Sequence, residues 1–111
     1  MFDAETYSFV PFDEKELPLE SIHVNKAFLS CAGFTSREGT FENAVLNSMI
    51  KRKMVHNADE VYLLIDAGKF GKRALAHVLD TRSIHTVITD MYVENVQEEL
   101  QSAGVKLVIA D

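Results

Sequence analysis

The sequence predicts an α/β fold, in which a mostly parallel sheet of about four strands lies between flanking helices in three layers. The prediction rests on an alternation: along residues 27–111, short apolar runs are followed by segments with helical periodicity. The order is strand, helix, strand, helix, strand, helix, strand, and strands joined through helices pair in parallel by right-handed crossovers. With 111 residues, 47% of them hydrophobic, residues 1–111 have the size of a single domain with its own core.

The central strand is predicted from the apolar run Val61 to Ile65, which is bounded by Asp66 and two glycines. Such a run is typical of a strand that is buried on both faces, so we expect Leu64 in this strand to be fully buried. A helix should follow the strand, because four apolar residues recur at helical spacing and share one face: Ala74, Leu75, Val78 and Leu79.

The N-terminal part carries the weakest pattern. We expect residues 1–26 to be irregular or to hold a short edge strand near residues 7–10, which Pro11 ends. Residues 27–31 predict a second buried strand, and the glycines at positions 33 and 39 allow the loop after it to turn tightly.

A long amphipathic helix is predicted from Phe41 to about His56, with Thr40 as its N-cap. Six apolar residues recur at spacings of three and four: Phe41, Val45, Leu46, Met49, Ile50 and Met54. The other face carries three successive cations at residues 51–53, where the helix macrodipole favours positive charge. We interpret these cations as a solvated face; contact with phosphate or DNA is the alternative.

The C-terminal part supplies the remaining elements. Thr86 to Thr89 predicts a third strand that ends at Asp90, and residues 93–100 predict a helix that Gly104 closes. Residues 105–110 predict the fourth strand.

Composition excludes several classes of function. The net charge of −6 argues against a nucleic-acid-binding protein, because binding to phosphates needs clustered Lys and Arg. The single cysteine, Cys31, has no internal disulfide partner and ends a buried strand, so we expect an inert core thiol and not a nucleophile. There is no signal peptide and no apolar run near twenty residues, which predicts a cytoplasmic protein without membrane contact.

Ligand chemistry is expected where the parallel strands end, because residues after each strand gather at one edge of the sheet. Lys69, together with backbone N–H groups freed by Gly68 and Gly71, suits a phosphate or carboxylate, although no P-loop spacing is present. An ordinary solvated Lys69 and a turn-forming Asp66 are equally compatible with the pattern. Asp90 either caps the next helix or orients Lys69.

Metal and cofactor chemistry is not predicted. The four histidines are scattered without metal-ligand spacing, and we expect them to be surface groups: His23, His56, His77 and His85.

Three stretches of the sequence resemble the C-terminal effector-binding domain of DeoR-type transcriptional regulators. They are NKAFLSCAGFTSREGT (residues 25–40), IKRKMVHNADEVYLLIDAGKFGK (residues 50–72) and IHTVITD (residues 84–90). With the last strand they cover residues 25–110 in the order and spacing of the family. The resemblance implies a sugar-phosphate-isomerase-like, Rossmann-like fold that binds a phosphorylated sugar or a similar small anionic metabolite. It also implies that DNA is bound by a separate N-terminal helix-turn-helix domain, which we expect to lie outside this chain.

Two elements of the family pattern match residue by residue. The D-x-[SG]-K-[FL] element falls on Asp66, Gly68, Lys69 and Phe70, and the G-x-[DT]-x-x-x-G-[LT] loop falls on Gly33, Thr35, Gly39 and Thr40. Gly68 stands where the family usually has Ser, and Thr35 where it usually has Asp, so a hydroxyl and a carboxylate of the family's usual pocket are missing. With Asp90, the resemblance implies eight ligand-binding positions: Gly33, Thr35, Gly39, Thr40, Asp66, Gly68, Lys69 and Asp90.

The expected function is an effector-sensing and oligomerisation module of a regulator of sugar metabolism, not an enzyme. The family's domain is longer, so we expect this chain to be its C-terminal portion, with an unpaired strand edge near Phe28 that favours a homo-oligomer. Two alternatives remain: a sugar-phosphate isomerase-like fragment, for which Glu38 is the one carboxylate of its loop, and an interaction module without a ligand.

Overall fold

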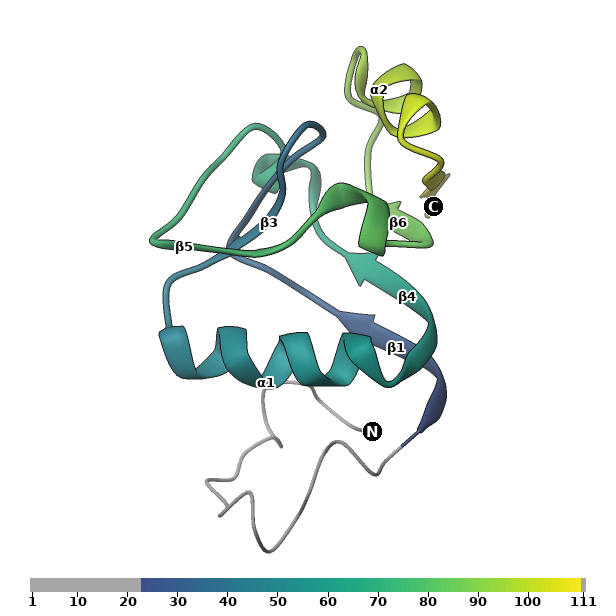
Figure 1. Ribbon diagram of the computed structural model, residues 1–111. Coiled ribbons are helices and arrows are strands. Elements are labelled where there is room, and N and C mark those ends of the chain that lie inside the picture. Colours follow the sequence, from purple (N-terminus) through teal and green to yellow (C-terminus); the bar gives the residue numbers. More distant parts are fainter. Residues whose placement is uncertain (1–22, 111) are drawn as a thin grey trace, which may run out of the picture.

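The computed structural model describes residues 23–110, and the edge strand expected near residues 7–10 lies outside them. The described residues form strands and helices with short 3-10 turns between them (Figure 1). The strands are β1 (Val24–Leu29), β2 (Gly33–Thr35), β3 (Gly39–Glu42), β4 (Ala58–Leu64), β5 (Ala76–Leu79), β6 (Thr86–Thr89) and β7 (Lys106–Ile109). The helices are α1 (Val45–His56) and α2 (Val96–Ser102), and the 3-10 turns are η3 (Ala67–Lys69) and η4 (Thr81–Ser83).

The main sheet is parallel, with the strand order β1-β4-β6-β7. Its central register row runs from Leu29 to Leu63, then to Val87 and Leu107, one residue from each strand. The predicted α/β class with a parallel sheet of four strands is confirmed, and the sheet carries two helices in a Rossmann-like arrangement.

A second, smaller sheet replaces one of the predicted helices. The segment expected to be helical around Val78 and Leu79 is the strand β5, which pairs antiparallel with β3 in the order β2-β3-β5. Tertiary hydrogen bonds explain the difference: Leu79 N donates to the Thr40 hydroxyl, and the Arg52 guanidinium donates to the carbonyls of β5. These partners outweigh the helical spacing of the apolar residues.

The helix α1 begins four residues later than predicted. Phe41 lies in β3, where it pairs with Gly33, and Thr40 is buried in the same strand and does not cap the helix. Ala44 stands at the N-cap without a side-chain hydrogen bond. The hairpin of β2 and β3 therefore takes the residues that the periodicity had assigned to the first turn of α1.

The orientation of α1 also differs from the prediction. Ser48 and Lys51 are its buried residues, whereas the apolar Val45, Leu46 and Met49 are exposed, Leu46 at 63%. Only the C-terminal half of α1 packs its apolar residues on the sheet, through Met54 and Val55.

Both helices cover the same face of the main sheet. Val96 and Leu100 of α2 pack in a cluster with Leu63 and Val87, while the end of α1 packs on Leu29 and Val61. Because Leu29, Leu63 and Val87 are register neighbours, the two clusters lie on one side. Leu64 points to the other side and is 43% exposed, so the expectation that the central strand is buried on both faces is wrong for the described residues.

No helix among the described residues is long and apolar enough to cross a membrane.

The two neighbouring leucines of β4 give a direct test of this orientation. Replacing Leu63, which is 1% exposed, by Ala should cost about 2–5 kcal/mol of unfolding free energy, because it leaves a cavity in the core. The matched change Leu64→Ala should cost well under half as much, since its side chain already meets solvent. Urea unfolding of both variants measures the difference. Equal losses would contradict the assignment of Leu63 to the core and of Leu64 to the exposed face of the sheet.

Candidate functional site

The predicted convergence of loops is present at the carboxyl ends of β4 and β6. The η3 turn directly after β4 presents Lys69, and Asp90 follows the end of β6. Asp90 Oδ1 accepts a hydrogen bond of 2.8 Å from Ala67 N, which ties the end of β6 to the turn after β4. Two strands that are neighbours in the sheet thus hold one cluster of charged groups.

Within the turn, Asp66 holds both the backbone and the lysine. Its Oδ1 accepts from Gly68 N at 2.9 Å, and its Oδ2 accepts from Lys69 Nζ at 2.8 Å. The hydrogen bond from Lys69 lowers the pKa of the Asp66 carboxyl, and the same bond raises the pKa of the Lys69 ammonium. Asp66 also caps η3, as the turn-forming interpretation predicts.

The cluster combines one cation with two carboxylates that face solvent. Lys69 Nζ uses one of its three donors on Asp66, which leaves donors for an anionic ligand group. The carboxylates accept hydrogen bonds only, and hydroxyl groups of a ligand are donors that match them. The arrangement suits a small molecule that carries hydroxyls next to an anionic group.

The other four predicted positions lie on the hairpin of β2 and β3. Gly39 has a φ of +113°, and a Cβ there would stand 1.9 Å from the Leu79 carbonyl oxygen, so that only glycine fits. At Gly33 a Cβ would stand 2.4 Å from the Lys72 carbonyl oxygen. The buried Thr40 uses its hydroxyl to accept from Leu79 N at 3.2 Å. In the described structure these three residues shape the hairpin.

Thr35 is the hairpin residue that faces open space. Its hydroxyl donates to Glu38 Oε1 at 3.1 Å and accepts from Glu38 N at 3.0 Å. Glu38 in turn accepts two hydrogen bonds from the Arg73 guanidinium, at 2.8 and 3.0 Å, which lower the pKa of the Glu38 carboxyl. The turn of the hairpin is therefore closed by an ion pair to the segment before β5.

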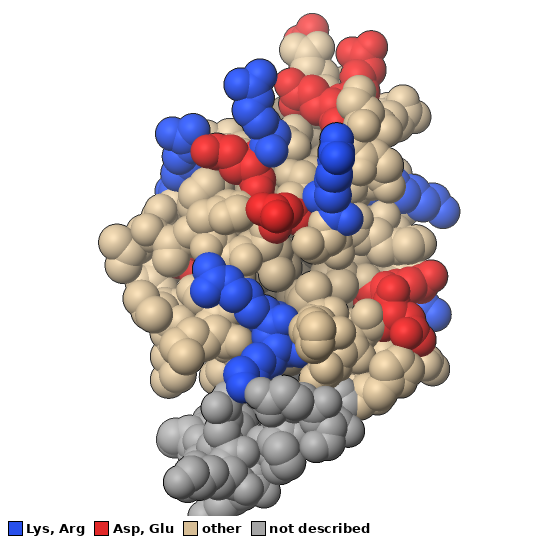
Figure 2. Space-filling view, in the orientation of Figure 1, with Lys and Arg blue, Asp and Glu red and all other residues tan. Residues whose placement is uncertain are grey.

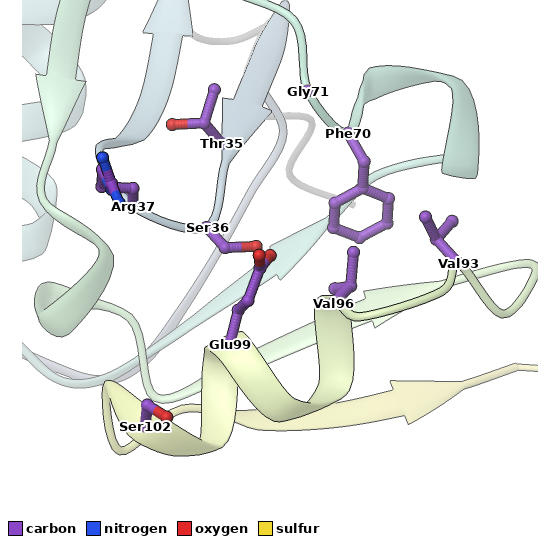
Figure 3. Close-up of a pocket in the computed structure, with 9 residues that line it drawn as sticks. All are labelled: Thr35, Ser36, Arg37, Phe70, Gly71, Val93, Val96, Glu99 and Ser102. Atoms are coloured by element: carbon purple, nitrogen blue, oxygen red, sulfur yellow. The ribbon is translucent and has the colours of Figure 1, made fainter.

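A cavity of about 540 Å³ opens between this hairpin turn and α2 (Figure 3). Phe70 and Val96 form an apolar wall, while Ser36 and Glu99 point toward each other across the opening. Thr35 is its one predicted site residue. The full lining is Thr35, Ser36, Arg37, Phe70, Gly71, Val93, Val96, Glu99 and Ser102.

The cavity adjoins the charged cluster through a short backbone link. Phe70 follows Lys69 in the chain, forms an isolated bridge with Phe34, and packs edge-on against its ring at 5.7 Å. Gly71 N donates to the Phe34 carbonyl at 2.7 Å. The sequence pattern gave no sign of Glu99 or Ser102, because α2 reaches the hairpin only through the fold.

A buried ion pair lies behind the site, where the sequence predicted a solvated cation. Lys51 Nζ donates to Glu42 Oε2 at 2.5 Å and to the Ser30 carbonyl at 2.6 Å, and both side chains of the pair are about nine-tenths buried. Burial, reinforced by the negative charge of Glu42, raises the pKa of the nearby Cys31 thiol to about 11, in line with an inert core thiol.

On the face seen in Figure 2, Lys and Arg side chains lie among Asp and Glu side chains and do not form one large basic surface. Among residues 23–110 no group of three or more His, Cys, Asp or Glu side chains is placed to hold a metal ion.

Comparison with known proteins identifies the family. Residues 1–91 match the model of the DeoR C terminal sensor domain. The chain belongs to this family. It is 35% identical over 75 residues to the uncharacterized HTH-type transcriptional regulator YulB of Bacillus subtilis, covering 68% of the chain and 29% of that protein. It is 32% identical over 95 residues to the L-fucose operon activator of Haemophilus influenzae, covering 85% of the chain and 38% of that protein.

A third relative is the HTH-type transcriptional regulator IolR of Bacillus subtilis, which is 33% identical over 94 residues, or 85% of the chain and 37% of that protein. The chain thus spans about a third of the length of these curated relatives. The family and its relatives are transcriptional regulators and not enzymes, so the isomerase alternative has no support.

The buried ion pair leads to a stability prediction. Lys51→Ala should cost about 3–5 kcal/mol, because it leaves the Glu42 carboxylate buried without a counter-charge. The double change Glu42→Leu with Lys51→Met should recover most of this loss, and the exposed Lys106→Ala serves as the control. Urea midpoints measure all three. A Lys51→Ala midpoint equal to that of Lys106→Ala would contradict the buried pair.

The Cys31 thiol leads to a pH prediction. Its pKa rises from 9.0 to about 11 on folding, so between these pH values the folded chain keeps a proton that the unfolded chain releases. The stabilising effect is complete below pH 9 and is lost as the pH rises toward 11, by about 1.4 kcal/mol per pH unit. Unfolding free energies at pH 8, 9 and 10, taken relative to Cys31→Ala, should show this decline. A constant difference would mean that the thiol is not buried.

Proposed function

We propose that this DeoR sensor domain chain is the effector-sensing and self-associating part of a cytoplasmic regulator of sugar metabolism. Its effector is a phosphorylated sugar or a similar small anionic metabolite. The observation that carries the proposal is the cluster of Lys69 with Asp66 and Asp90 at the carboxyl ends of two parallel strands, the edge at which open α/β sheets bind ligands. One relative, the L-fucose operon activator of Haemophilus influenzae, supports a sugar-related role.

In the proposed complex, Lys69 binds the anionic group of the effector. The solvent-facing oxygens of Asp66 and Asp90 accept hydrogen bonds from its hydroxyls. Gly68 leaves room for the Asp66 carboxylate within the turn, because a Cβ at this position would stand 3.0 Å from Asp66 Oδ1. Thr35 lines the adjoining cavity, which has the size of a small-molecule pocket.

The three remaining predicted positions support the site from behind. Gly33, Gly39 and Thr40 fix the path of the hairpin, which the Phe34 and Phe70 bridge joins to the turn that carries Lys69. Effector binding at this turn would be coupled to the affinity for DNA, which requires two states with different effector affinity. DNA contact is assigned to a helix-turn-helix domain of the regulator and not to the residues described here.

Lys69 supplies the test of the proposal. Calorimetric titration with a panel of sugar phosphates and the matching unphosphorylated sugars should find at least one phosphorylated sugar that binds more tightly than its free form. Lys69→Ala should then weaken that binding about ten- to hundredfold, the loss expected for a charge-assisted hydrogen bond.

Lys72→Ala is the matched control, because this lysine is exposed and lies three residues further along the chain. It should leave the affinity within about twofold of the parent chain. Equal affinities for Lys69→Ala and the parent would remove Lys69 from the site, and preference for the free sugars would overturn the phosphorylated ligand.

A further inference from the structure

The cavity between the hairpin turn and α2 has an apolar wall and a polar rim. The wall consists of Phe70, Val93 and Val96, which belong to the core cluster of the main sheet or pack against it. The rim carries polar side chains from two elements that are far apart in the sequence, among them Ser36 of the hairpin turn and Glu99 of α2 (Figure 3). An apolar wall with a few convergent polar groups is the usual composition of a small-molecule pocket.

Three of the polar groups on the rim are available to a ligand. Within the described part of the chain, the Glu99 carboxylate and the Arg37 guanidinium form no ion pair, and the Ser36 hydroxyl forms no hydrogen bond. The hydroxyls of Thr35 and Ser102, by contrast, already have partners, which are the Glu38 side chain and a carbonyl of α2. The rim therefore offers one carboxylate, one guanidinium and one hydroxyl.

These three groups define the chemistry of the ligand part that fits the cavity. A carboxylate only accepts hydrogen bonds, a guanidinium only donates them, and a hydroxyl does both. Several hydroxyls on one small frame can satisfy all three groups, because each hydroxyl is both a donor and an acceptor. The one positive and the one negative charge of the lining cancel, which favours an uncharged ligand part. A sugar ring has such hydroxyls, and its C–H faces can pack on the apolar wall.

The cavity lies next to the turn that carries Lys69. Phe70 of the apolar wall follows Lys69 directly, and consecutive Cα atoms are about 3.8 Å apart. The Lys69 ammonium is also close enough to Cys31 for an electrostatic interaction, and Phe70 packs against the core cluster that contains Cys31. The ammonium and the apolar wall are thus neighbours at the carboxyl edge of the sheet.

We propose that the cavity is the subsite for the uncharged sugar ring of the effector, with Phe70 against a C–H face of the ring. Glu99, Arg37 and Ser36 bind the ring hydroxyls, while the anionic group of the same molecule binds Lys69. This inference rests on the proposed function and specifies which part of the effector each half of the site binds. The rim residues determine which sugar is recognised, because a hydroxyl in the wrong position leaves a polar group without a partner.

Heteronuclear NMR of the full chain separates the two halves of the site. The probes are glucose, galactose, mannose and fructose, the corresponding sugar phosphates, and inorganic phosphate alone. Inorganic phosphate should shift the backbone amide signal of Lys69 and not that of Glu99. The free sugars should shift the amide signals of Ser36, Phe70 and Glu99, because they occupy the cavity without an anionic group.

Glu99→Ala measures the contribution of the ring subsite. It should weaken the binding of a free sugar and of its phosphate by the same factor, about tenfold or more, as expected for a hydrogen bond to a charged group. Ser36→Ala should act in the same direction, whereas Lys69→Ala should weaken the sugar phosphate alone. Glu98→Ala is the matched control: it removes an exposed carboxylate of the same helix that does not line the cavity, and should leave both affinities within about twofold.

Unchanged affinities for both Glu99→Ala and Ser36→Ala overturn the ring subsite and leave the proposed anion site at Lys69 standing. The ring subsite is supported, and the phosphorylated effector alone overturned, if Glu99→Ala weakens the free sugars but no phosphate binds more tightly than its free sugar. Valine brings an ammonium and a carboxylate in place of hydroxyls, so shifts of the Glu99 signal with valine and none with the sugars overturn the assignment to a sugar ring. Absence of shifts at the cavity with every sugar probe overturns it as well.

Discussion

The buried ion pair of Glu42 and Lys51 is the interaction on which the described arrangement depends. It joins three parts that share no continuous strand: β3 of the small sheet, the middle of α1 and, through the Ser30 carbonyl, the end of β1. Taking two charges out of water is costly, and the cost is compensated only while both partners and the carbonyl stay in place. The pair therefore fixes where the small sheet sits relative to the main sheet, and with it the hairpin that borders the candidate site.

Much of the main sheet was predictable from sequence, because its strands are short apolar runs that end at polar residues. The errors lie where tertiary contacts override local pattern. Val78 and Leu79 have helical spacing but find backbone partners on β3, and Phe41 pairs within a hairpin although it fits the periodicity of α1. Leu64 was expected to be buried because an apolar run does not reveal that both helices cover the same face.

The candidate site likewise has a part that the sequence predicts and a part that depends on tertiary contacts. Asp66, Gly68, Lys69 and Asp90 follow directly after two neighbouring strands, so the rule that strand ends gather at one edge brought them together correctly. The cavity beside them was not predictable, because Ser36 and Glu99 are 63 positions apart in the sequence and meet only through the placement of α2. The family resemblance added the hairpin residues, whose contacts in the described structure are mainly with the backbone of β5 and of residue 72.

The hydrogen bonds of Asp66 and Asp90 to the backbone of η3 have a consequence for the energetics of the proposed effector binding. Because Ala67 N and Gly68 N already have carboxylate partners, the turn is ordered before any ligand arrives. A ligand that binds a preorganised turn spends little free energy on immobilising the chain. More of its binding free energy then remains for shifting the balance between two conformations of a regulator, and this balance determines how strongly a metabolite alters transcription.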